Sequence, residues 1–178
     1  MIYYKDDEIK IRDVSSDDIN YLFMWNIDKE LNKYDPKPIP KSPQELLEEC
    51  KVFCKKFETE IINQDFIKRK YKYFIITNHN DYPIGFVNLF SIDKIKKQGE
   101  MGVIIGDKRY FKKGIAYKSI KNVIEYIFNN TDNEKVYIET SEFNIPALKL
   151  FEKLDFKRVD EYIEDDKFKF IVMEKVKS

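Results

Sequence analysis

Residues that bind metals or form cross-links are scarce in this chain of 178 residues, which has two cysteines and one histidine. These are too few for an ordinary four-ligand zinc site unless carboxylates take part. Cys50 and Cys54 lie four residues apart in an expected helix, and that spacing is usually too wide for a relaxed disulfide. We therefore expect no metal site, and we interpret both cysteines as buried or half-buried thiols.

The sequence also lacks a long apolar run and a net charge. No stretch approaches the roughly 18 apolar residues of a membrane span. The first residues alternate charged and apolar positions and have no apolar signal-peptide segment. Lys plus Arg total 32, as do Asp plus Glu, a balance that argues against a nucleic-acid coat protein. We expect a cytoplasmic protein with no nucleic-acid or membrane partner.

Apolar and aromatic residues are plentiful, at 43% and 15% of the chain. They suffice for a sizeable core in which ring packing is important. The length fits one domain over residues 1–178, and no repeat, low-complexity segment or linker interrupts it.

The spacing of apolar residues predicts a mixed α/β order. Ser42 and Glu45 form a capping-box pattern with Pro43 at the first helical position, and the four prolines within residues 34–43 predict a loop. Strands are expected over residues 8–14, 71–77, 84–92, 100–105, 135–139, 158–164 and 168–174, and helices over 15–26, 42–67, 114–128 and 146–154. The strand, helix and strand in the middle predict a parallel strand pair.

Two segments have the composition of a binding site. Residues 102–116 form a strand, a short loop and a helix start, where free backbone N–H groups and the positive helix end favour phosphate. Gly114 allows close backbone approach. No Gly-Lys-Ser/Thr pattern of a Walker loop is present. The second segment, residues 144–156, places Asn144 before a proline-started helix and ends in a sharp turn. Taken singly, these segments fit an ordinary strand–helix connection and a capped surface helix.

Together, the two segments resemble the GNAT superfamily of N-acetyltransferases. The first resembles the coenzyme A pyrophosphate loop, Gln/Arg-x-x-Gly-x-Gly/Ala, with Gly114 and Ala116 at its last two fixed positions. The second resembles the family's Asn-x-x-Ala-x-x-Leu-Tyr-x-x-x-Gly-Phe helix, beginning at Asn144. The order of elements is also similar, over nearly the whole chain. Residues 22–34 and the run IGFVNLF resemble the branch of ribosomal-protein and polyamine acetyltransferases.

The resemblance implies a GNAT-like α/β domain, whose mixed, mostly antiparallel sheet has a central parallel strand pair and about four flanking helices. It also implies acetyl-coenzyme A as co-substrate and a primary amine as acceptor. Three positions depart from the family pattern. Phe111 replaces the usual Gln or Arg, Phe151 the Tyr that is a frequent general acid, and Asp155 the Gly of the turn. Asp tolerates positive φ better than most residues, so the turn can survive.

The resemblance assigns cofactor contacts residue by residue. The pyrophosphate is expected at the backbone amides of Lys112, Lys113, Gly114, Ile115 and Ala116, and Phe111 is a further expected cofactor contact. The strand residues Met101, Val103, Ile104 and Ile105 are expected to bind the pantetheine and to polarise the thioester carbonyl. Asn144 is expected to bond to the pantetheine arm or to a bound water, and Phe151 is a further expected cofactor contact.

An acceptor ammonium with a pKa of about 10.4 must lose a proton before direct attack, so a carboxylate or a water chain is expected to help. Glu100, at the start of the strand beside the cofactor, is our first choice of base, and Glu139 is the second. Each also fits an exposed strand charge with no catalytic part. Tyr110, Tyr117 and Tyr137 are unranked substitutes for the missing Tyr.

Two further functional hypotheses stay open at this point. One is a non-catalytic acyl-coenzyme A-binding module, motivated by Phe151 and by the lack of an unambiguous base. The other is an interaction domain without a cofactor. The acceptor is equally open between a protein N-terminus, a polyamine, an aminoglycoside and an amino sugar. A homodimer is compatible with the sequence, although no segment specifies it.

Overall fold

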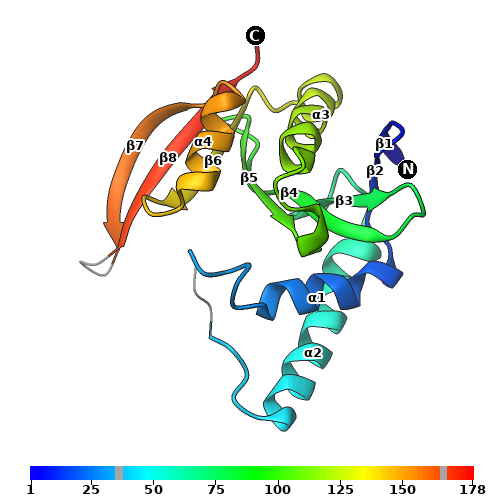
Figure 1. Ribbon diagram of the computed structural model, residues 1–178. Helices are drawn as coiled ribbons and strands as arrows, with labels where there is room; N and C mark the ends of the chain where they lie inside the picture. Colours follow the sequence, from blue (N-terminus) through cyan, green and yellow to red (C-terminus); the bar gives the residue numbers. More distant parts are fainter. Residues whose placement is uncertain (35–37, 165–167) are drawn as a thin grey trace.

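A computed structural model describes residues 1–34, 38–164 and 168–178 (Figure 1). Eight strands form one sheet in the order β1-β2-β3-β4-β5-β6-β8-β7. The strands are β1 (Ile2–Lys5), β2 (Ile9–Asp13), β3 (Lys72–Asn78), β4 (Pro83–Asp93), β5 (Gln98–Ile105), β6 (Lys135–Ser141), β7 (Lys157–Glu164) and β8 (Phe168–Val176). The helices are α1 (Ile19–Ile27), α2 (Pro43–Phe57), α3 (Ile115–Asn130) and α4 (Ile145–Lys153), with short helical turns η1 (Ser16–Asp18), η2 (Glu58–Ile62) and η3 (Lys108–Tyr110).

The sheet is mixed, as predicted. Neighbouring strands are antiparallel except β5 and β6, which are parallel and are connected through α3. A parallel pair needs such a crossover because the chain must return to the same end of the sheet. The predicted mixed, mostly antiparallel sheet with a central parallel strand pair is therefore confirmed.

Successive side chains of a strand point to opposite faces of the sheet, so each face presents its own apolar side chains. Helices cover both faces. Phe74 and Ile76 of β3 join a large core that also contains the buried faces of α3 and α4. Ile75, between them, joins a second core formed with α1 and α2. Figure 1 shows α1 and α2 together, apart from α3 and α4.

The structure corrects two element predictions. The helix expected over residues 42–67 ends at Phe57 and continues only as the π-type turn η2 to Ile62. Beyond η2, the side chains of Arg69 and Lys72 donate hydrogen bonds to the backbone carbonyls of Gln64, Phe66 and Arg69. In a longer helix these carbonyls would accept from backbone N–H groups instead. Strand β1 was not predicted, since it has only four residues, none of them fully buried, and carries little periodic signal. Within the predicted proline loop, residues 35–37 lie outside the described residues.

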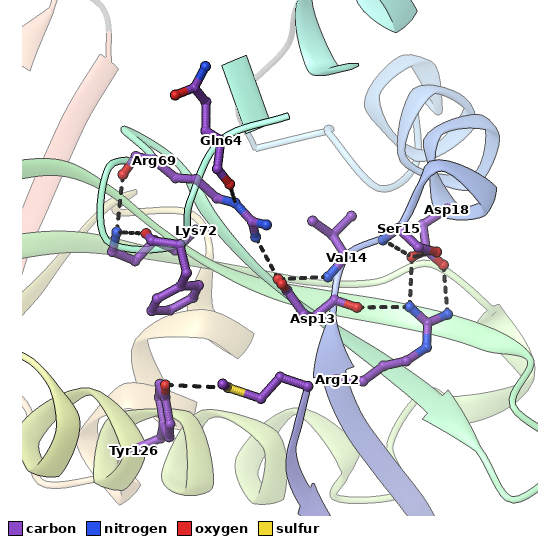
Figure 2. Close-up of polar contacts among 11 residues, drawn as sticks. Arg12, Asp13, Val14, Ser15, Asp18, Gln64, Arg69, Lys72 and Tyr126 are labelled. Carbon is purple, nitrogen blue, oxygen red and sulfur yellow. Dashed lines mark hydrogen bonds and ion pairs between the residues drawn. The ribbon is translucent and has the colours of Figure 1, made fainter. Parts of the chain in front are cut away.

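Paired charges anchor the start of α1 (Figure 2). Arg12 donates two hydrogen bonds to the Asp18 carboxylate, at 2.7 and 2.8 Å, and Asp18 also accepts from Ser15 N at 2.8 Å. Asp13 accepts a 2.6 Å bond from Arg69. The end of β2, the first turn before α1 and the loop before β3 are thereby held together, and α1 is positioned to line the site described next.

None of the helices in the described ranges is long and apolar enough to cross a membrane.

Candidate active site

Strands β5 and β6 separate part-way along their length. Their parallel register runs from Gln98 opposite Lys135 to Glu100 opposite Tyr137 and stops there. Residues 101–105 remain paired with β4 on one side, and residues 138–141 remain paired with β8 on the other. The facing edges beyond Glu100 and Tyr137 therefore carry backbone donors and acceptors that an extended polar ligand can use.

The loop before α3 lies at the open end of this separation. Lys112 and Gly114 both have left-handed backbone, with φ values of 59° and 77°. Left-handed residues in a turn direct N–H groups into an anion-binding concavity, and the first turn of a helix adds unpaired N–H groups. A Cβ placed on Gly114 would have no heavy atom within 4 Å, so space over this backbone is open. Lys112 and Lys113, both exposed, add positive charge.

A cavity of about 280 Å³ opens against the free edge of β5. Gly102, Val103 and Ile104 of β5 line it, as do Thr140 of β6 and Asn144 before α4. The remaining lining comes from α1, α2, the loop after α1, and strands β3 and β4. Aromatic rings and amides dominate this lining: Tyr34, Phe53, Tyr73, Phe86 and Phe90 together with Asn26, Asn32, Asn88 and Asn144. No carboxylate occurs among the described lining residues.

Asn32 and Tyr73 are two of the neutral polar residues in this lining. Asn32 donates from its amide nitrogen to the carbonyls of Trp25 and Asp28, at 2.9 and 2.8 Å, and so closes the loop after α1. Burial raises the pKa of the Tyr73 hydroxyl to about 12, which keeps it protonated at neutral pH. The cavity therefore presents neutral polar groups within apolar walls.

Glu100 and Tyr137 meet where β5 and β6 part. Glu100 is half-buried, lies opposite Tyr137 in β6 and pairs with Phe90 in β4. Burial raises the pKa of Tyr137, and the charges of Glu100 and Glu139 raise it further. Tyr137 therefore stays a proton donor at neutral pH beside a carboxylate. Of the three tyrosines proposed from the sequence, Tyr137 is the one next to Glu100.

The other two tyrosines have different surroundings. Tyr110 accepts a 3.0 Å hydrogen bond from Asn78, which fixes the loop before α3 to the β3–β4 hairpin. The Tyr117 ring lies under the ammonium of Lys153, which is 4.9 Å from the ring centroid.

Glu139 lies farther out on the same sheet surface. It is exposed and accepts a 2.7 Å hydrogen bond from the Tyr162 hydroxyl. Burial and the bond to Glu139 raise the pKa of Tyr162. Neither Glu100 nor Glu139 belongs to the cavity lining, although the Phe90 partner of Glu100 does.

Among the other predicted contact residues, Asn144 lines the cavity, whereas Met101 and Phe151 are buried in the core. Asn144 caps α4, accepting from Ala147 N at 3.3 Å and donating to Thr140 Oγ1 at 2.9 Å, and it also lines the cavity. Met101 and Phe151 are each 3% exposed and pack in the large core, so only the backbone of Met101 can face the free edge. Phe151 has a packing role against Phe156, at 5.0 Å between ring centroids, and its predicted cofactor contact stays a prediction.

These residues fit coenzyme A at two points. The left-handed loop and the start of α3 suit a pyrophosphate, and the free strand edge suits an amide-containing arm. The family model of the acetyltransferase (GNAT) domain matches residues 8–157. The chain belongs to the GNAT acetyltransferase family. The predicted resemblance is thus confirmed.

The GNAT chain is similar to several named proteins. It is 32% identical over 75 residues to an N-alpha-acetyltransferase of Saccharolobus solfataricus, covering 42% of this chain and 45% of that protein. It is 35% identical over 97 residues to an N-acetyltransferase 9-like protein of Caenorhabditis briggsae, covering 51% of this chain and 48% of that one. The chain thus matches about half the length of these relatives.

Two solved structures share the fold over nearly their whole length. The ribosomal L7/L12 alpha-N-protein acetyltransferase RimL, in complex with coenzyme A, superposes with a TM-score of 0.77 at 14% identity, covering 99% of this chain and 98% of that one. The spermidine N-acetyltransferase of Vibrio cholerae, in complex with coenzyme A and spermine, gives 0.75 at 20% identity, covering 97% of each chain.

Sequence reasoning missed the residues that line the cavity from β3 and β4. Asn88 carried a usable signal, because it stands between Phe86 and Phe90 on one face of β4, and the other residues from Pro83 to Phe90 carry no polar side chain. A polar side chain at such a position is unusual unless it has a partner or a ligand.

Proposed function

We propose that this GNAT protein is an acetyl-coenzyme A-dependent N-acetyltransferase whose acceptor is an α-amino group, as at the N-terminus of a peptide. The observation that supports this proposal best is the cavity of rings and amides at the free edge of β5, with no carboxylate among its described lining residues. The co-substrate, when bound, supplies an acyl carbon activated as a thioester. Residues of this chain would bind the amine, orient it and accept its proton.

The lining favours an amine that loses its proton easily. An ammonium group entering the cavity loses water and gains no opposite charge there, so its pKa falls. An α-amino group has an ordinary pKa near 8, against about 10.4 for an alkyl ammonium, and this difference is worth about 3 kcal/mol. The names of the archaeal relative and of RimL, both α-N-acetyltransferases, agree with this acceptor.

We propose Glu100 as the base that takes the proton of the amine, directly or through water. Its position where β5 and β6 part supports this role, as does its nearness to Tyr137. Tyr137, protonated at neutral pH, is the proposed proton donor to the leaving sulfur. Thiols with a pKa near 8.5 need little such help, so replacement of the usual Tyr by Phe151 is compatible with turnover.

A panel of acceptors tests the proposal. Release of free thiol from acetyl-coenzyme A would be followed with a peptide that has a free α-amine and an internal Lys, the same peptide with its α-amine blocked, spermidine, an aminoglycoside and an amino sugar. We expect turnover with the free peptide alone, and mass spectrometry should place the acetyl group on its first residue. The blocked peptide is the matched control, because it differs only at the α-amine.

Glu100 and Glu139, on the sheet surface beyond the cavity, favour a second candidate acceptor, a polyamine chain lying along these charges. Faster turnover of spermidine than of the free peptide would replace the first proposal by this one. Binding of coenzyme A without turnover of any amine would support the non-catalytic module instead.

A further inference from the structure

Asn88 has a buried oxygen without a partner. Within the described ranges, three buried side-chain atoms lack a hydrogen-bond partner: Tyr3 Oη, Asn88 Oδ1 and Ser119 Oγ. Tyr3 packs among the rings of Phe66, Phe74 and Tyr126, and Ser119 lies in α3. Neither Tyr3 nor Ser119 lines the cavity. Asn88 does line the cavity. The unpartnered acceptor therefore belongs to a residue of the cavity wall.

The sheet places this oxygen beside the free edge of β5. Asn88 pairs with Tyr73 of β3 and with Gly102 of β5. A Cβ at Gly102 would lie 2.5 Å from Asn88 Oδ1, closer than any real contact of that kind. Glycine at position 102 thus leaves the room that the amide oxygen occupies. Gly102 is also two residues beyond Glu100, on the stretch of β5 that has lost its partner β6.

A buried carbonyl oxygen without a donor is costly, and the cost disappears when a ligand supplies an N–H group. A neutral amine can do so and still keep its lone pair free, since the amide oxygen accepts a hydrogen and does not bond to the lone pair. A carboxylate at this position would hold the unreactive ammonium instead. An asparagine is therefore suited to orienting an uncharged nucleophile.

We propose that Asn88 Oδ1 accepts a hydrogen bond from the acceptor amine and orients its lone pair toward the free edge of β5 at Gly102. This inference rests on the proposed function and adds to it the residue that binds the nucleophile. Asn88 makes no predicted contact with the pyrophosphate loop, so coenzyme A affinity should not depend on it.

Asn88→Leu tests the proposal because leucine has a similar size and no acceptor. With the peptide acceptor, kcat/KM should fall by roughly tenfold or more, as expected for a lost hydrogen bond to a reacting group. The Kd of coenzyme A, measured by calorimetry on the same sample, should change by less than about twofold. Ser119→Ala, which removes another unpartnered buried oxygen away from the cavity, is the matched control and should leave both constants unchanged.

Asn88→Asp provides a second readout that a purely structural role would not produce. It keeps an oxygen acceptor, so the KM of the peptide should stay near the wild-type value. Its negative charge stabilises the ammonium form of the bound amine, so the rise of kcat with pH should move to higher pH. This variant also serves if Asn88→Leu does not fold.

The experiments distinguish failure of the Asn88 role from failure of the proposed function. Wild-type turnover together with unchanged acceptor kinetics in Asn88→Leu, or an unshifted pH profile in Asn88→Asp, would refute the role of Asn88 alone. A wild-type protein that binds coenzyme A and acetylates no amine would refute the proposed function, and this inference with it.

Discussion

Lys112 and Gly114 determine what the loop before α3 can bind. Their positive φ values, 59° and 77°, turn backbone N–H groups toward one point ahead of the helix. Asp155 also has a left-handed backbone, with a φ of 66°, in the turn after α4, where the family pattern has glycine. A short polar side chain tolerates this conformation, whereas a branched one does not.

Replacement of Gly114 by valine should weaken coenzyme A binding by roughly tenfold or more, a loss of about 1.4 kcal/mol or more. The side chain would occupy the open space over the backbone where we expect the pyrophosphate. The left-handed backbone should also cost about 1–2 kcal/mol of stability, so calorimetric titration must be paired with urea unfolding. Gly114→Asn, which tolerates this conformation, separates strain from blocking. Unchanged affinity in the valine variant would place the pyrophosphate elsewhere.

Substitution of Glu100 by Gln keeps the shape of the side chain and removes its charge. If Glu100 accepts the proton of the amine, kcat should fall by roughly a hundredfold or more, and the loss should shrink at high pH, where more amine is already neutral. Coenzyme A affinity should hardly change. Glu125→Gln, an exposed carboxylate on α3, is the control. A higher KM with unchanged kcat would instead mean that Glu100 only holds a cationic acceptor.

At the scale of elements, the site depends on two placements, the parting of β5 from β6 and the position of α1. The first is seen in the register, because β6 is paired with β8 over all of Lys135–Ser141 but with β5 at only three residue pairs. The second depends on the Arg12–Asp18 ion pair, in which the Asp18 side chain is 2% exposed (Figure 2). Leu22 and Asn26 reach the cavity from that helix.

Asp18→Ala should lower the free energy of unfolding by about 3 kcal/mol, because it leaves Arg12 without its partner and removes the cap on Ser15. Guanidinium unfolding curves would measure the loss. Asp17→Ala, at an exposed position in the same turn, should change stability by less than about 0.5 kcal/mol. The KM of the acceptor should rise in the Asp18 variant alone, since α1 lines the cavity. Equal stability of the two variants would show that the ion pair does not hold α1.

For the whole molecule, we expect coenzyme A to bind a surface built from β5, the loop after it and α3, and so to stabilise the folded state as a unit. At a hundred times its Kd a ligand adds about 2.7 kcal/mol, which for a chain of this size corresponds to a rise in Tm of about 5–10 °C. A thermal-shift titration measures it. Pantetheine, which lacks the phosphates, is the control and should give a smaller rise. A flat Tm at saturating coenzyme A would contradict the proposed co-substrate.

Signals carried within a few residues could be interpreted from the sequence. Ser42 was expected to cap a helix and does accept from Glu45 N, at 3.2 Å, because a cap involves only its own turn. The loop ending at Gly114, the turn at Asp155 and the apolar spacing of α3 are local in the same way. The parallel pair was also predictable, since a strand, a helix and a strand in succession have few ways to pack.

What only the tertiary structure decided concerns residues that are distant in the chain. Asn88, Tyr73 and Gly102 meet because three strands adopt one register, and no local pattern specifies where β6 leaves β5. The end of α2 at Phe57, short of the predicted residue 67, likewise depends on Lys72 and Arg69 binding carbonyls of the preceding loop. Local conformation follows from neighbouring residues, whereas a cavity follows from the packing of every element around it, and that packing is the sum of many contacts between residues far apart in the chain.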